Sequence, residues 1–172
     1  MAEKLTWSVP KKAASASAAA PAPVNDTLGA ELVQPLFAEA LARWQAAGAD
    51  SSALQGVEVR IADLGGLTLG VASGNTIWLD DDAAGWGWFV DPTPGEDAEF
   101  ATPGDQGEQG RMDLLTVLEH EIGHLLGRDH EESGLMAETL SAGTRKDPGC
   151  DADAASFQDA IFALLAAEKH TI

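Results

Sequence analysis

Residues 118–130 read LEHEIGHLLGRDH and carry three of the four histidines in the chain. His120 and His124 are four residues apart, so on a helix their imidazoles lie on one face, roughly 6 Å from each other. Glu121 follows His120 and completes H-E-x-x-H, a pattern of two zinc ligands and a general base. The alternative, a buried helix whose histidines are simply satisfied, does not explain their shared register.

Gly127 and His130 extend the pattern to H-E-x-x-H-x-x-G-x-x-H. In a continuing helix His130 would face away, about 600° on from His124. Glycine can adopt the left-handed conformation that ends a helix, and it would turn His130 back toward the other two rings. The spacing therefore predicts a zinc site with His120, His124 and His130 as ligands and Glu121 as the catalytic residue.

This motif resembles that of the metzincin clan of zinc peptidases. The resemblance implies that Gly127 ends the active-site helix and that Met136, in SGLMAETL, forms a hydrophobic floor beneath the metal. Further similarities favour the matrixins (matrix metalloprotease-like), in the form found as modules of large bacterial surface or secreted proteins. These similarities lie in KLTWSV (4–9), FAEALARWQ (37–45), LTLGVAS (67–73) and GNTIWLDDDAAGW (74–86).

The fold that the resemblance implies is α+β and metzincin-like, a twisted mixed β-sheet with an N-terminal helix, an active-site helix and a C-terminal helix. Apolar periodicity and turn residues indicate the same elements. The predicted helices are 30–47, 113–126 and 153–169, and the predicted strands are 57–64, 67–73 and 76–80.

Residues at the ends of these elements support their boundaries. Asn25-Asp26-Thr27 offers caps for the first helix, Gly48 ends it, and Asp113 caps the second helix. Gly74-Asn75 predicts a hairpin turn between two strands. We expect residues 1–26 to contain a strand followed by a flexible Ala/Pro-rich segment (10–24), and residues 27–172 to form the catalytic domain.

The activity that the resemblance implies is that of a zinc metalloendopeptidase, a hydrolase. The three neutral imidazoles would leave a position on zinc for water, and Glu121 would take that water's proton and pass it to the leaving amine. An extended peptide substrate would pair with Leu67–Ser73, the expected edge strand. Two alternatives remain: a zinc-stabilised adhesion or structural module that cleaves nothing, and a self-processing domain of a larger secreted protein.

Acidic residues after a predicted strand, Asp80, Asp81 and Asp82, are candidate calcium (Ca2+) ligands, and a solvated acidic turn is the equal alternative. Zinc (Zn2+) and calcium are thus the two cofactors considered. The chain also differs from the matrixin pattern in two ways. No histidine precedes His120, so the family's second, structural zinc should be absent. Cys150 lies downstream of the zinc motif, where we expect a free thiol.

Residues 85–112 form a long acidic insert where matrixins pass quickly to the active-site helix. Its aromatic residues could line the cleft as a wall or lid, but packing of the insert on the domain is the favoured interpretation. Its acidic residues are weaker calcium candidates and are expected in a solvated loop. The aromatic residues are Trp86, Trp88 and Phe89, and the acidic ones are Asp91, Glu96, Asp97 and Glu99.

The charge balance limits the partners. With 28 acidic against 10 basic residues, the net charge of -18 argues against nucleic acid and anionic membranes as partners. No stretch approaches the roughly 18 apolar residues of a membrane span. MAEKLTWSVPKK lacks the pattern of a signal peptide. We expect a monomer or a module of a longer secreted polypeptide, acting outside the cell or at its surface on extended peptide or protein substrates.

Overall fold

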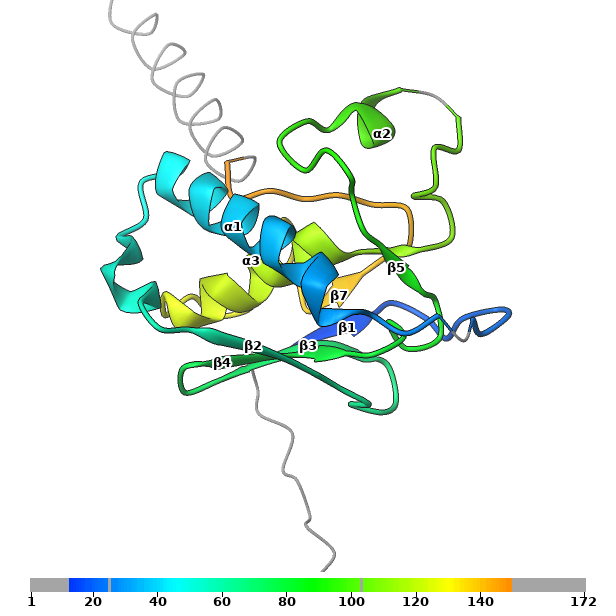
Figure 1. Ribbon diagram of the computed structural model, residues 1–172, viewed down its shortest axis with the longest axis horizontal. Helices are drawn as coiled ribbons and strands as arrows, with labels where there is room; N and C mark the ends of the chain where they lie inside the picture. The colour runs from blue at the N-terminus through cyan, green and yellow to red at the C-terminus, as the bar shows by residue number, and fades with distance from the viewer. Residues whose placement is uncertain (1–12, 25, 103, 150–172) are drawn as a thin grey trace, which may run out of the picture.

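The computed structural model describes residues 13–24, 26–102 and 104–149, which form an α+β fold (Figure 1). Its main sheet has five strands in the order β2-β4-β3-β1-β7. Strand β2 is parallel to β4, β3 is antiparallel to β4, and β1 lies antiparallel to β3 and parallel to β7. These strands are β1 (Ala13–Ala16), β2 (Glu58–Ala62), β3 (Thr68–Ser73), β4 (Thr76–Asp80) and β7 (Thr139–Leu140). The mixed sheet is the one predicted.

Strand β4 shows why these segments form a sheet with one covered face. Ile77 and Leu79 are completely buried, whereas Thr76 and Trp78 are only partly covered. Since successive side chains of a strand point to opposite faces, this alternation places one face of β4 in the core. The predicted turn at Gly74-Asn75 joins β3 to β4 as a hairpin.

Helices α1 (Ala30–Ala46) and α3 (Leu114–Leu125) lie side by side on one face of the sheet (Figure 1). Trp44 of α1 is buried between them, and its indole N–H donates to the carbonyl of Glu119 at 2.8 Å. Helix α1 ends at Gly48, as predicted, and a 3-10 helix (Ser51–Leu54) leads on to β2. Among the described residues, no helix is long and apolar enough to cross a membrane.

The prediction of a flexible connection over residues 10–24 is wrong for residues 13–16, because Ala13–Ala16 form strand β1. The expectation that Leu67–Ser73 is an edge strand is wrong for the same reason, since β1 pairs with β3 along its outer side. Composition could not show this, because Ala and Ser carry no apolar periodicity and the strand is held by backbone hydrogen bonds.

The start of α1 also differs from the prediction. Its N-cap is Gly29, which makes no side-chain capping bond, in place of Asp26 or Thr27. The N–H of Leu28 donates to the carbonyl of Asp81 at 2.8 Å, so the chain is held in extended form there and the helix begins later. The predicted opening strand (4–9) and C-terminal helix (153–169) lie outside the described residues.

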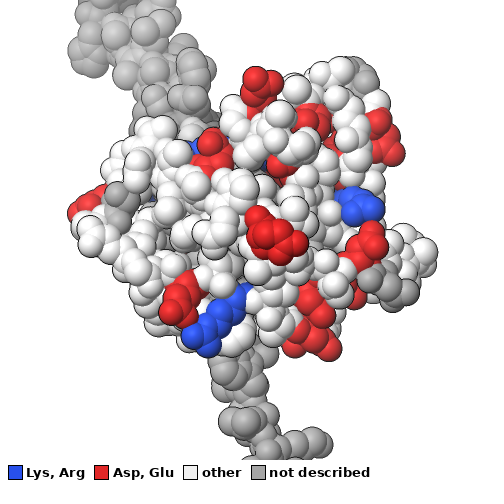
Figure 2. Space-filling model, viewed as in Figure 1, with Lys and Arg blue, Asp and Glu red and all other residues white. Residues whose placement is uncertain are grey.

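The acidic insert contains strand β5 (Trp88–Phe89) and the short helix α2 (Ala98–Ala101), and it leads into β6 (Met112–Asp113), which pairs with β5 in parallel. Trp88 and Phe89 are buried, and the indole N–H of Trp88 donates to the carbonyl of Asp80 at 2.9 Å. These contacts support packing of the insert on the domain over a free aromatic lid. Elsewhere the surface is acidic, and Figure 2 shows few basic side chains among the acidic ones on the face in view.

Candidate metal centre

Helix α3 carries the first part of the histidine motif and is anchored at its start. The Asp113 carboxylate caps it by accepting from the Thr116 N–H at 3.1 Å and from the Thr116 hydroxyl at 2.7 Å. Every residue from Leu114 to His124 is buried. Because both ends of this helix segment are packed, His120 and His124 have fixed positions on its surface.

The end of α3 brings in the third histidine. Gly127 has a φ of 88°, in the left-handed region. Its N–H donates to the carbonyl of His124 at 3.0 Å, and the Arg128 N–H donates to the carbonyl of Gly123 at 2.9 Å. These two bonds form a Schellman motif, in which glycine is favoured because other residues are strained there. The chain turns back after Gly127 and places His130 beside the other two rings, as the spacing predicts.

The three imidazoles meet through their Nε2 atoms. Nε2 of His130 lies 3.3 Å from that of His120 and 3.1 Å from that of His124. The Nδ1 atoms of the two helical histidines bond to backbone carbonyls, those of Leu135 at 2.8 Å and Arg128 at 2.9 Å. Carbonyls only accept, so Nδ1 carries the proton in each neutral ring and Nε2 presents a lone pair.

This donor set fits a zinc ion. Three lone pairs directed at one point repel each other unless a cation lies between them. Tetrahedral zinc with Zn–N distances of about 2.0–2.1 Å separates its nitrogen ligands by about 3.3 Å, close to the spacing found. Burial, assisted by the neighbouring His124 and His130 and opposed by the hydrogen bond to Leu135, lowers the pKa of His120 to about 4, so this ring is neutral and able to coordinate a metal at pH 7.

Met136 packs beneath the histidine helix. It is almost fully buried, and its Sδ would lie only 2.5 Å from a Cβ added at Gly123. The same turn supports the site directly, because the Leu135 carbonyl accepts from His120. Gly123 is therefore needed for the close approach of the methionine turn to α3, and the role of Met136 as a floor beneath the metal stays a prediction.

Glu121 is completely buried between α3 and the sheet. Its Oε1 accepts from the backbone N–H of Ala14 in β1 at 2.9 Å, while Oε2 has no hydrogen-bond partner among the described residues. A Cβ added at Gly70 of β3 would lie 3.0 Å from Glu121 Cγ, so glycine leaves room for this carboxyl group. Burial raises the pKa of Glu121 to about 8, against hydrogen bonds from Ala14 and Ala72 that lower it.

In the acidic turn after β4, carboxylates accept hydrogen bonds from backbone N–H groups of the same domain. The two oxygens of Asp80 accept from the backbone N–H groups of Leu64 at 2.8 Å and Ala84 at 2.7 Å. Asp82 accepts from the Gly85 N–H at 2.8 Å. The side-chain oxygens of Asp80, Asp81 and Asp82 lie close enough together to share an ion, but these bonds already account for the first and third residues. Calcium at this turn stays a prediction.

Arg145 is a residue that the sequence did not indicate. Its guanidinium lies 2.6 Å from Asp91, 2.8 Å from the helix cap Asp113 and 2.9 Å from Asp97. It thereby ties the insert to the start of α3. The expectation that the insert acids lie in a solvated loop is wrong for Asp91, which is buried, whereas Asp97 is exposed and pairs with Arg43 as well. No local pattern marks such a residue, because its partners are distant in sequence.

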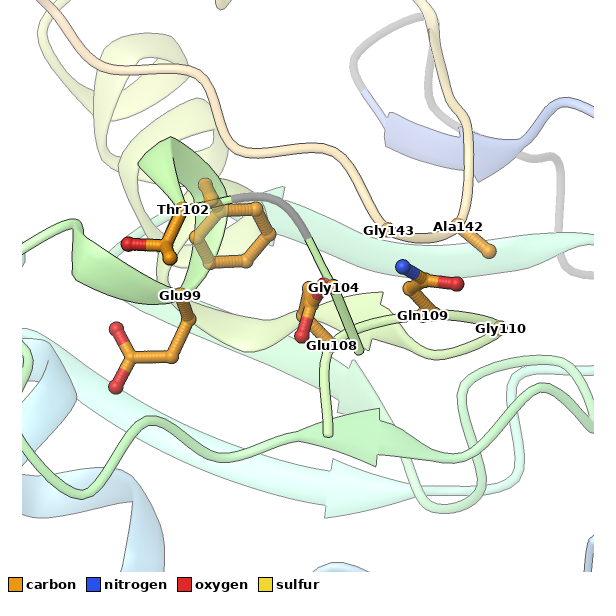
Figure 3. A pocket seen from close by; sticks show the side chains of 9 residues that line it. Glu99, Thr102, Gly104, Glu108, Gln109, Gly110, Ala142 and Gly143 are labelled. Carbon is orange, nitrogen blue, oxygen red and sulfur yellow. The ribbon is translucent and has the colours of Figure 1, made fainter. Parts of the chain in front are cut away.

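A polar hollow of about 430 Å³ lies between the insert and the loop at Ala142 and Gly143 (Figure 3). Glu99, Glu108 and Gln109 contribute polar side chains to it. It contains none of the three histidines and is separate from the candidate metal centre.

Comparison with known families agrees with this geometry. The family model described as matrixin (peptidase M10) matches residues 6–159, which is most of the chain. Comparison with curated proteins and with solved structures gives no match. With the α+β fold and the three convergent imidazoles, this match shows that the chain belongs to the matrixin family of metzincin metallopeptidases.

Proposed function

We propose that the chain is a zinc-dependent endopeptidase whose zinc is held by His120, His124 and His130 and whose general base is Glu121. The observation that carries this proposal is the convergence of three Nε2 lone pairs beside a helix, α3, that also bears the buried carboxyl group of Glu121. A purely structural zinc site has all four positions filled by protein ligands and needs no base. Three imidazoles with an adjacent carboxylate suit a catalytic site.

Zinc bound there would supply Lewis acidity to the scissile carbonyl and to the attacking water. Residues of the chain fix the histidine tautomers and transfer the proton. The Leu135 and Arg128 carbonyls fix the tautomers of His120 and His124, which keeps Nε2 free of a proton. Glu121 removes a proton from water and delivers it to the leaving nitrogen.

The substrate in this proposal is an extended peptide. Its backbone would take the place of β1 as the strand between β3 and β7. Peptide docked there comes close to Glu121, as the Ala14 amide does. Action outside the cell, as expected from the resemblance, and calcium binding at Asp80 to Asp82 are further predictions that this proposal does not require.

The test compares the wild type with Glu121→Gln and His130→Ala. Metal analysis and cleavage of a library of foreign peptides are measured for each. We expect the wild type and Glu121→Gln to bind zinc in equal amounts and His130→Ala to bind it much more weakly. Glu121→Gln should cleave roughly 10²–10⁴-fold more slowly, the usual contribution of a general base. Equal cleavage by Glu121→Gln would refute the mechanism, and zinc binding with no cleavage by any form would favour the non-catalytic module.

A further inference from the structure

We propose that the chain's own segment 13–17 is bound as a substrate and that the site cleaves the Ala13–Ala14 peptide bond in the same molecule. This inference rests on the proposed peptidase function and names its first target. It starts from the position of β1, which completes the sheet between β3 and β7 although its sequence, Ala-Ala-Ser-Ala, carries no large apolar side chain.

The backbone of this segment is bound along both sides. Toward the β3 side, the Ala16 N–H donates to the carbonyl of Leu67 at 2.7 Å. Toward β7, the N–H groups of Ser15 and Ser17 donate to the carbonyls of Glu138 and Leu140 at 3.0 Å and 2.8 Å. Alternating bonds to two flanking segments hold an extended chain by its backbone, as in recognition of peptides by strand addition. The binding depends little on side chains.

The bond nearest the candidate base is Ala13–Ala14. The nitrogen of this peptide bond donates to Glu121 Oε1 at 2.9 Å, within the range for proton transfer. Ala14 lies opposite Gly70 in the ladder, and Gly70 is where β3 leaves room for the glutamate. A group that delivers a proton to a leaving amine must lie at the nitrogen of the bond that breaks. Of the amides in β1, that of Ala14 meets this condition.

The side chain of Ala14 lies over a small pocket. Val117 and His120 of α3, Leu135 of the methionine turn and Thr139 of β7 are among its walls. The free volume that these residues and Ala14 enclose is about 10 Å³, about the space of one water molecule, so little room is left beside the Ala14 methyl group. The pocket therefore accepts a small residue on the C-terminal side of the cleaved bond, as the segment provides.

The reaction is a balanced hydrolysis. The oxygen of one water molecule adds to the carbonyl carbon of Ala13, and the carbon–nitrogen bond to Ala14 breaks. Glu121 passes one of the water's protons to the nitrogen of Ala14, and the second proton joins it, so that Ala14 leaves as an ammonium group and residues 1–13 leave with a terminal carboxylate. Water is the only co-reactant, and no oxidation or reduction takes place.

The experiment incubates the full chain with zinc and follows intact mass and N-terminal sequence with time. We expect a product that begins at Ala14, formed with first-order kinetics at a rate that does not change over a wide range of protein concentration. Glu121→Gln should stay intact. Cleavage at another bond, or a rate that rises with protein concentration, would overturn the inference.

A pair of proline variants tests the contact itself. Ala14→Pro removes the N–H that donates to Glu121, and we expect cleavage to slow by about tenfold to a hundredfold, the worth of a hydrogen bond to a charged group. Ala19→Pro is the matched control, because Ala19 is exposed and lies beyond β1, and its rate should equal that of the wild type. Equal rates for both variants would overturn the inference.

The peptide library separates the two proposals. A wild type that cleaves foreign peptides but leaves its own Ala13–Ala14 bond intact overturns self-cleavage and keeps the peptidase function. A zinc-loaded wild type that cleaves neither overturns both. Self-cleavage at Ala14 that Glu121→Gln abolishes supports both.

Discussion

Arg145 offers the sharpest test of how the insert is attached to the active-site helix. Its side chain is only 4% exposed, and those of Asp91 and Asp113 are fully buried. Arg145→Met keeps most of the volume but leaves two buried carboxylates without their cation. Removing one partner of a buried ion pair costs about 3–5 kcal/mol, a large part of a typical domain stability of about 5–15 kcal/mol. For a domain of this size the melting temperature should fall by about 6–20 °C.

The assay is urea unfolding followed by tryptophan fluorescence, with the slope of the free energy against urea compared between variants. Arg60→Met is the control, because Arg60 is 55% exposed and pairs with Glu58 on the surface. Such a pair contributes about 0–1 kcal/mol. If Arg145→Met lowers the free energy of unfolding no more than Arg60→Met does, then Arg145 does not hold the insert to α3 and the reasoning fails.

Further predictions concern the metal centre and its surroundings. Gly127→Ala should destabilise the protein by about 1–2 kcal/mol in thermal unfolding, because its Cβ meets nothing but its φ of 88° is strained. Gly123→Ala should weaken zinc binding, measured by titration, and cost about 1–3 kcal/mol, since its Cβ would lie 2.5 Å from Met136 Sδ. Removal of zinc by a chelator should lower the melting temperature, by the equivalent of about 2.7 kcal/mol relative to zinc at a hundred times its Kd. Burial raises the pKa of Asp97, but its two arginine partners outweigh this and lower it below 3.8. The wild type should therefore be more stable than Asp97→Asn above pH 3.8, and this difference in the free energy of unfolding should vanish as the pH falls through the lowered pKa. Unfolding of both proteins at several pH values measures the difference.

The convergence of the three histidines could be predicted because its pattern is local. His120 and His124 are related by one helical turn, and Gly127 ends the helix in a way that depends only on its own conformation and two backbone hydrogen bonds. The limits of α3 follow from the same short-range rules, and its cap is Asp113 as predicted. Interactions within about a dozen residues decide all of these features.

The attachment of the insert could not be predicted, since it depends on pairs distant in sequence. Arg145 and Asp91 are 54 residues apart. The sequence shows only that the insert is acidic, and an acidic loop of this kind is equally consistent with solvation or with calcium. Which carboxylates are buried depends on the position of Arg145, which follows the methionine turn in the sequence. That position is set by the packing of the whole domain.

Strand β1 escaped prediction for a different physical reason. A core strand is recognised by large apolar side chains at every second position, because those side chains hold it in place. Ala13–Ala16 are instead held by backbone hydrogen bonds to both neighbours, and the small pocket beside Ala14 leaves little room for a larger side chain. Those are the requirements of a bound peptide, which must fit a site that accepts different sequences. A segment with such short side chains has the composition of a linker, so its strand is not recognised from sequence. The same short side chains allow the segment to lie close to Glu121.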